Sequence, residues 1–359
     1  MRRFAVLGLL AVLLAAGAVA ALPRVAAELP KPLDDVARLP ERLWTRVFPP
    51  RTPKGARLEG LTGPEREAVA RLAGKLDGRL VWSSNRSGNH ELYLLDLAAR
   101  SVKRLTNSPN VDYFGRISPD GKRIVFLRSQ RQWVSARETT AWDVFLMDVD
   151  GKNERRIARG GYHPTWAANG TAVVFQRGLQ AIRLDVASGQ ESVLLDGPQA
   201  IPGLTEVGDP ELSPDGRRLA LYPRGPHAGN AVFDLTARTL TLLGEVQACQ
   251  PSWAPDGQSL VWIEIEGHGG TRVMAGRPDG SGRRVLIDLP GSHSHEYFPK
   301  LANDGRWLVW GASAGGHEHD RADYEIFVWE VGTPVEQALR LTHHESNDQW
   351  PDLWIRAAR

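Results

Sequence analysis

Short apolar runs alternate with polar turns along most of the chain, from residue 77 to the C-terminal end. Three of these runs are Arg123–Phe126, Leu219–Tyr222 and Trp307–Trp310, each rich in aliphatic and aromatic residues. Asp, Asn and Gly stand in the turns before the runs, and this stretch has no long segment with the 3.6-residue period of an amphipathic helix. The pattern predicts antiparallel strands joined by tight turns.

The turns before the apolar runs repeat a Pro-Asp-Gly phrase or a close variant of it. The five copies end at Gly121, Gly170, Gly216, Gly257 and Gly305, so that successive copies are 49, 46, 41 and 48 residues apart. A period of this size is typical of an array of β units. Each period has room for several short apolar runs, which predicts four antiparallel strands in each unit.

The two ends of the array are incomplete in complementary ways. The first unit begins at its Asp-Gly turn, in residues 77–82, and lacks the strand that precedes this turn in the other units. Residues 350–354 supply that missing first strand. Joined, they form a sixth unit, and the closed ring has no exposed sheet edge at the junction. We therefore predict an all-β fold over residues 77–359: a six-bladed β-propeller of four-stranded antiparallel blades, closed by the C-terminal strand joining the N-terminal blade.

Residues 83–97, 104–107 and 118–124 resemble the repeat of TolB-like propellers, and the likeness recurs in every blade. TolB carries an α/β domain before its propeller, whereas only residues 23–76 separate the N-terminal apolar segment from the first blade here. TolB is a periplasmic part of the Tol envelope system. The resemblance therefore implies an exported propeller whose partner is an envelope protein, a peptide or a glycan.

The N-terminal region divides into an export segment and a linker. Residues 1–22 combine Arg2 and Arg3 with an apolar stretch and a small-residue cleavage site, which predicts a signal peptide; the alternative is an uncleaved membrane anchor. Either reading places the protein in the periplasm or outside the cell, with the membrane touched only through this segment. Residues 23–76 are Pro-rich and partly helical, and Thr62 followed by Glu65 predicts a helix over 64–76.

The charge pattern argues against a nucleic-acid partner, and the cysteine content excludes an internal disulfide. The chain has 359 residues and a formal net charge of +2, and no basic stretch is interleaved with aromatic residues, so a nucleic-acid partner is not expected. Cys249 is the only cysteine, which rules out an internal disulfide in spite of the predicted export. We expect a monomer.

Propeller geometry assigns the loops to two faces. The loops between the second and third strands of a blade, and those that connect successive blades, share one face, which we call the upper face. All ten histidines lie in or next to these loops, and Asp112, Glu296 and Asp348 occupy the same repeat position in three consecutive blades. Because loops on a rigid scaffold carry most binding functions, we expect the binding site here, formed by these residues with Trp133 and Gln349.

Six histidines gather on the upper loops of blades six and one. They are His293, His295, His317, His319, His343 and His344. Imidazole with neighbouring carboxylates suits Mn, Zn or Fe, although polar loop residues without a metal give the same pattern. The set resembles that of oligogalacturonate lyases, propellers that hold manganese with histidines and a glutamine, and Gln349 would be the glutamine here.

Two function hypotheses follow. The first is a non-enzymatic, exported TolB-like propeller that binds a protein, peptide or glycan at its upper face and needs no cofactor. The alternative is a metal-dependent polysaccharide lyase or hydrolase that uses the His and carboxylate cluster on blades six and one.

Overall fold

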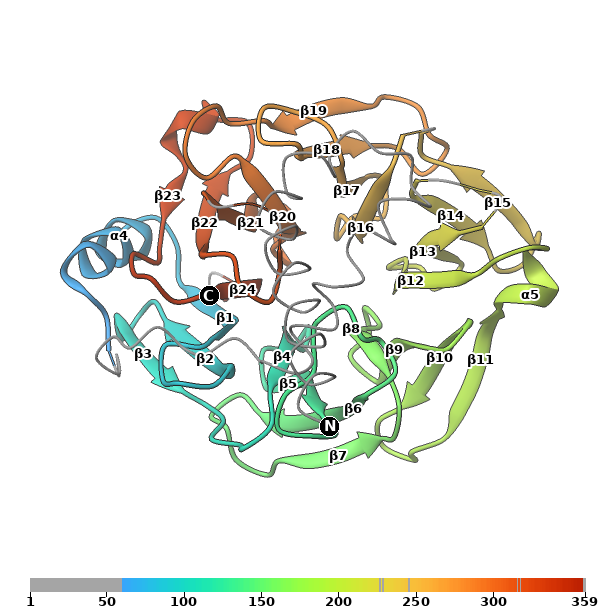
Figure 1. The fold of residues 1–359 in the computed structure, drawn as a ribbon, viewed down its shortest axis with the longest axis horizontal. Helices are drawn as coiled ribbons and strands as arrows, with labels where there is room; N and C mark the ends of the chain where they lie inside the picture. The colour runs from blue at the N-terminus through green and yellow to red at the C-terminus, as the bar shows by residue number, and fades with distance from the viewer. Residues whose placement is uncertain are drawn as a thin grey trace, which may run out of the picture. The chain divides into compact units, whose positions relative to one another are not determined.

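A computed structural model describes residues 60–357 except residues 226, 228, 245, 315 and 317. All of them belong to the compact unit Thr52–Arg359. This unit contains six four-stranded antiparallel sheets arranged around a central axis (Figure 1). The predicted six-bladed β-propeller is therefore confirmed. The predicted leader and most of the linker lie outside the described residues, and no helix within the described residues is long and apolar enough to cross a membrane.

Each blade runs from an inner strand at the channel to an outer strand at the rim. The inner strands of blades one to six are β24 (Asp348–Ile355), β4 (Asp112–Ile117), β8 (Tyr162–Trp166), β12 (Glu206–Leu212), β16 (Ala248–Trp253) and β20 (His295–Leu301). The second strands are β1 (Gly78–Ser84), β5 (Arg123–Ser129), β9 (Ala172–Arg177), β13 (Arg218–Arg224), β17 (Leu260–Glu264) and β21 (Trp307–Ser313). The third strands are β2 (Glu91–Asp96), β6 (Trp142–Asp148), β10 (Gln180–Asp185), β14 (Ala231–Asp234), β18 (Arg272–Gly276) and β22 (Tyr324–Glu330). The outer strands are β3 (Ser101–Arg104), β7 (Arg155–Ala158), β11 (Glu191–Asp196), β15 (Thr239–Leu242), β19 (Arg284–Ile287) and β23 (Leu339–Arg340).

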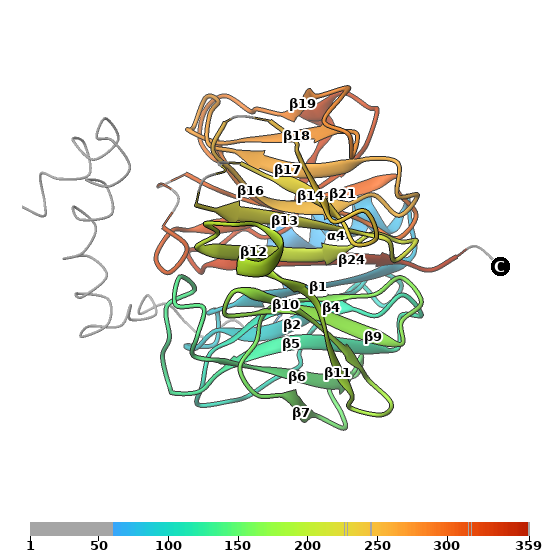
Figure 2. The ribbon, with the colours of Figure 1, turned by 90° about the vertical axis from the view of Figure 1, so that its right-hand side faces the viewer.

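Blade one closes the ring with strands from both ends of the propeller. Strand β24 pairs antiparallel with β1, with Gly78 opposite Ile355 and Ser84 opposite Asp348. In the side view of Figure 2 the strands run between two faces that carry the loops. Because the last strand completes the first sheet, the ring is held by backbone hydrogen bonds as well as by side-chain packing. The predicted closure by the C-terminal strand is confirmed.

Each inner strand carries an irregularity at the same repeat position. The register of inner and second strands shifts there in all six blades. One residue at each shift has a positive φ between 50° and 60°: Phe114, His163, Asp209, Gln250, Phe298 and Trp350. Such a conformation is unfavourable for non-glycine residues, so the surrounding structure has to impose it. Five of the six residues directly precede a proline of the repeat, and Phe114 precedes Gly115.

Helix α4 (Gly63–Ala73) packs against the rim at the junction of blades six and one (Figure 1). A capping box forms its start, with Thr62 N–H donating to Glu65 Oε2 at 2.6 Å. Val69 and Leu72 are buried in one apolar cluster with Trp82 of blade one and Trp307 of blade six. The predicted helix is confirmed, although it ends at Ala73 rather than at residue 76, because Gly74 follows.

Candidate binding site at the channel mouth

The six positive-φ residues form a closed ring of contacts across the central channel. Trp350 and Phe114 have ring centroids 4.3 Å apart, and Phe114 and His163 4.1 Å apart. His163 Nδ1 lies 2.5 Å from Asp209 Oδ1, and Asp209 Oδ2 accepts the Gln250 N–H at 2.9 Å. Gln250 Oε1 accepts the Phe298 N–H at 2.7 Å, and Phe298 contacts Trp350 at 5.1 Å. Every blade thus contributes one residue, which we call a channel-ring residue.

A charged layer lies next along the inner strands, toward the lower face. Lys300 Nζ is 3.1 Å from Glu211 Oε2 and 3.1 Å from Ser252 Oγ, which links blades four, five and six. Arg116 donates to the Trp350 carbonyl at 3.3 Å, and Asp352 accepts the Ile117 N–H at 2.7 Å. The channel is therefore filled by two successive layers of side chains. A ligand that enters from the upper face meets a floor.

The channel ring has an aromatic half and a polar half. Phe298, Trp350 and Phe114, from blades six, one and two, are only 4%, 1% and 2% exposed. On blades three and four, the side chains of His163 and Asp209 keep 15% and 14% exposure. Gln250, on blade five, is also only half-buried. The channel ring is therefore more exposed on blades three, four and five than on blades six, one and two.

Two long loops cover the aromatic half. Residues 130–141 of blade two and residues 318–323 of blade six meet across blade one, where Asp320 accepts the Ser135 hydroxyl at 2.5 Å and the Ala136 N–H at 2.9 Å. Arg137 Nε donates to Glu318 Oε1 at 3.2 Å in the same contact. The two loops hold each other in place, so the cover is preformed.

His319 belongs to the blade-six loop of this cover, and its ring lies 4.9 Å from Tyr297 and 5.1 Å from Phe298. Its carbonyl accepts the side-chain amides of Asn347 at 2.7 Å and Gln349 at 2.5 Å. The structure thus brings His319 and Gln349 together, by a backbone contact at the edge of the mouth. Trp133, predicted as a binding residue, is partly buried against the apolar core.

Carboxylates dominate the mouth. Arg137 forms an ion pair with Glu318, and Arg224 forms one with Glu206 at 2.9 Å. Asp209 and Asp320 add two more carboxyl groups. Burial would raise the pKa of Asp209, but His163 and the Gln250 N–H outweigh it, and the pKa is lowered. Burial raises the pKa of Asp320 to about 6.

The three acidic residues predicted from the repeat register are fully buried at the upper ends of the inner strands. Asp112 accepts Arg128 Nε at 2.7 Å and Nη2 at 2.8 Å. Asp348 accepts the Trp82 indole N–H at 3.1 Å and Arg86 Nη2 at 3.4 Å. Glu296 accepts the Leu289 N–H at 3.0 Å. Their contacts therefore join strands and neighbouring loops within the propeller.

The described histidines of blades six and one have different partners. His344 Nε2 lies 3.1 Å from Asp348 Oδ2, whereas His343 Nε2 contacts the Arg340 carbonyl at 3.1 Å. Burial lowers the pKa of His293 and of His343, and Arg340 lowers both further. His295 lies at the start of β20, and burial lowers its pKa as well.

His317 is outside the described residues. Among the residues that the structure does describe, no group of three or more His, Cys, Asp or Glu side chains is arranged to hold a metal ion. A metal site on blades six and one remains a prediction.

Glu296 is expected to make the free energy of unfolding depend on pH, and the substitution Glu296→Gln isolates this contribution. Burial raises its pKa to about 8 from 4.5, so between these values the unfolded chain ionises while the folded protein stays protonated. Stability conferred by this position therefore falls as the pH rises. Relative to the native protein, Glu296→Gln is expected to gain about 3 kcal/mol of unfolding free energy between pH 5 and pH 8, measured by urea denaturation. A difference that stays constant with pH contradicts the assignment.

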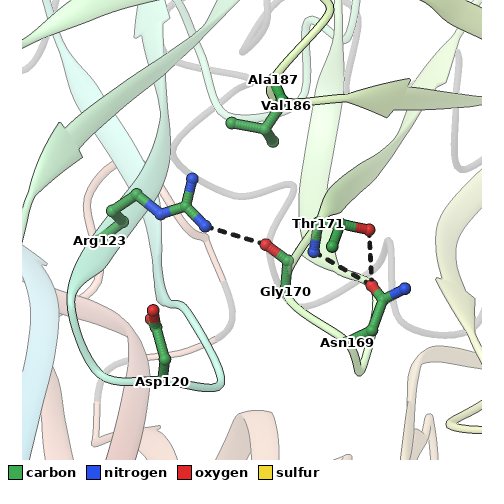
Figure 3. Close-up of a pocket in the computed structure, with 7 residues that line it drawn as sticks. All are labelled: Asp120, Arg123, Asn169, Gly170, Thr171, Val186 and Ala187. Atoms are coloured by element: carbon green, nitrogen blue, oxygen red, sulfur yellow. Dashed lines mark hydrogen bonds between the residues drawn. The ribbon is translucent and has the colours of Figure 1, made fainter.

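A hollow of about 260 Å³ on the lower face belongs to the scaffold (Figure 3). It is lined by Asp120, Arg123, Asn169, Gly170, Thr171, Val186 and Ala187. Arg123 crosses it to donate to the Gly170 carbonyl at 3.0 Å. The same arginine-to-turn contact recurs from Arg79 to Gly121 and from Arg218 to Gly257. Because the contact repeats at three blade junctions, its role is to hold neighbouring turns together.

Sequence reasoning missed the polar half of the channel ring. His163, Asp209 and Gln250 were visible as the residues before Pro164, Pro210 and Pro251 of the repeat. Comparing that one position across blades would have shown three aromatic and three polar residues on opposite sides of the ring.

Comparisons with known proteins support the fold. No family model matches the chain. A curated, uncharacterized protein of Agrobacterium fabrum is 29% identical over 108 residues, which cover 28% of this chain and 37% of that protein. TolB from Acinetobacter baumannii is similar in structure with a TM-score of 0.58 and 14% identity, covering 77% of this chain and 66% of that one. The structure called a putative TolB from Agrobacterium tumefaciens is similar with a TM-score of 0.54 and 15% identity. The match covers 75% of this chain and 90% of that one.

An oligogalacturonate lyase solved with manganese gives a TM-score of 0.47 and 17% identity, covering 74% of this chain and 72% of that one. This likeness is too distant to carry an argument about activity. The chain spans about a third of the curated relative and just under two thirds of the Acinetobacter TolB. What the comparisons establish is a six-bladed β-propeller similar to those of the TolB structures.

Proposed function

We propose that this protein is a non-enzymatic binding module that holds a peptide segment of a partner protein in the upper channel mouth. One observation carries the proposal: contacts join the channel ring through all six blades, and its polar residues His163, Asp209 and Gln250 keep some solvent exposure. Convergent polar groups on a rigid scaffold are a usual feature of a binding site. With the predicted leader, the proposal places the partner in the cell envelope.

The residues around the mouth are preorganised. The floor of the mouth is cross-linked from blade to blade, and the cover over the aromatic half is fixed by Asp320. A partner would therefore lose little binding free energy to reorganisation of this protein. The polar half offers the side chains of His163, Asp209 and Gln250, which suit the backbone and side-chain groups of a peptide better than an apolar ligand.

The proposal is tested by selecting peptides from a random phage-displayed library on the purified protein. Binding of the selected peptides is then measured to the double variant Glu206→Gln, Asp209→Asn and to the lower-face control Arg123→Ala. We expect at least a tenfold loss for the double variant and less than a twofold change for the control. Peptides that bind the double variant as well as the native protein would place the site elsewhere and refute the proposal. The metal-dependent lyase or hydrolase remains the alternative prediction.

A further inference from the structure

We infer that the upper mouth recognises a positively charged side chain, a lysine or arginine, of the peptide it binds. This inference rests on the proposed function and adds the chemistry of the ligand. It is carried by the balance of charge around the mouth and by a buried hydroxyl beneath the cover.

The first argument is the charge balance. The mouth brings together two arginines, Arg137 and Arg224, the imidazole of His163, and four acidic residues: Glu206, Asp209, Glu318 and Asp320. His163 Nδ1 lies 2.5 Å from Asp209 Oδ1, so four carboxyl groups face two guanidinium groups and one imidazole. Each arginine already contacts a glutamate, so an acidic ligand would have to displace Glu318 or Glu206 from its partner. A cationic ligand meets an excess of carboxylates without breaking either pair. The excess of negative charge therefore favours lysine and arginine over glutamate and aspartate.

The carboxylates that a ligand can reach lie on blade four. The side chain of Glu206 is 29% exposed, and that of Asp209 is 14% exposed at the floor. Both belong to β12, on blade four, opposite the covered half of the channel ring. A long basic side chain that enters beside blade four would thus reach Asp209 from above.

The second argument is independent of the carboxylates. The hydroxyl of Tyr324, a fully buried residue, has no hydrogen-bond partner among the described residues. Arg137, Glu318 and Cys249 are within electrostatic range of this hydroxyl, which places it under the cover at the mouth. Burial raises its pKa well above the usual value, so the group stays a neutral phenol. The Tyr324 hydroxyl is one of fourteen buried side-chain N or O atoms without a hydrogen-bond partner among the described residues, and a water or a ligand group would satisfy it.

The surroundings of this hydroxyl suit a cation. The rings of Tyr297, Phe298 and His319 lie within about 6 Å of the Tyr324 ring, with centroid distances of 6.1, 5.3 and 5.9 Å. Ring faces attract ammonium and guanidinium groups, and a phenol oxygen accepts their N–H donors. An N–H donor of the ligand would supply the partner that Tyr324 lacks.

The test is isothermal titration of the full-length purified protein with two probes, trilysine and triglutamate, both N-acetylated and C-terminally amidated. We expect trilysine to bind at least tenfold more tightly than triglutamate in 50 mM NaCl. The double variant Glu206→Gln, Asp209→Asn should lose at least tenfold in trilysine affinity. The control Asp215→Asn, Asp256→Asn removes the same charge from the lower-face turns and should change the affinity less than twofold.

A second measurement separates general electrostatic attraction from the contribution of the Tyr324 hydroxyl to trilysine binding. Tyr324→Phe removes only that oxygen, and we expect a loss of threefold or more for trilysine. Equal affinity for the two probes, tighter binding of triglutamate, or equal losses in the mouth and lower-face variants would overturn the inference. If selected peptides bind at the mouth but carry acidic residues there, the inference fails while the proposed function stands; if none binds at the mouth, the proposed function fails.

Discussion

Replacing Arg86 with alanine is expected to lower the free energy of unfolding by about 3–5 kcal/mol. Arg86 Nη2 donates to Glu65 Oε1 at 3.2 Å and to Asp348 Oδ2 at 3.4 Å, and all three side chains are fully buried. Without the guanidinium, the two buried carboxylates keep only the His344 imidazole, whose Nε2 lies 3.1 Å from Asp348 Oδ2 and 3.5 Å from Glu65 Oε1. The loss is large because buried charge without compensation is costly, and urea denaturation at pH 7 measures it.

The matched control is Lys152→Ala, which breaks an ion pair with Asp150 whose side chains are 77% and 48% exposed. Solvent screens such a pair, so its loss is expected to leave the free energy of unfolding nearly unchanged. Helix α4 supplies Glu65, so hydrogen exchange in residues 63–73 should also accelerate in the Arg86 variant. Equal effects of the two substitutions would show that Arg86 does not join the helix to the propeller.

Trp350→Ala is expected to cost about 3–5 kcal/mol of unfolding free energy. The indole is 1% exposed and contacts Tyr113, Phe114 and Phe298, so its removal leaves a cavity among rigid neighbours. It also opens the channel ring on the strand that closes the propeller. Thermal and urea unfolding both report this effect.

Trp133→Ala provides the comparison, because this tryptophan is only partly buried at the edge of the core. Its truncation is expected to cost about 1 kcal/mol. If Trp350→Ala costs no more than Trp133→Ala, the channel ring does not contribute to the stability of the closed propeller.

The fold was predictable because its signals are local. Each Pro-Asp-Gly turn stands next to the apolar run that it precedes, and the period counts the blades directly. The closure was predictable as well, because residues 77–82 and 350–354 are complementary parts of one repeat. The start of helix α4 followed from Thr62 and Glu65, which are three residues apart.

The site was less predictable because its contacts join distant parts of the chain. Arg86 and Asp348 are 262 residues apart, and Ser135 and Asp320 are 185 apart. No local pattern shows that the loops of blades two and six cover the aromatic half of the channel ring. A count of histidines therefore directed attention to blades six and one, whereas the open polar surface lies on blades three to five.

Photo-crosslinking tests the central claim most directly, because it reports where a bound peptide lies. p-Benzoylphenylalanine is placed at one exposed position at a time: Thr205 beside the open half of the mouth, Ser292 and Glu345 in the histidine-rich loops, and Asp215 on the lower face. The account predicts that the tightest selected peptide crosslinks from position 205 and not from positions 292, 345 or 215. Crosslinking from position 292, 345 or 215 without crosslinking from position 205 would contradict it.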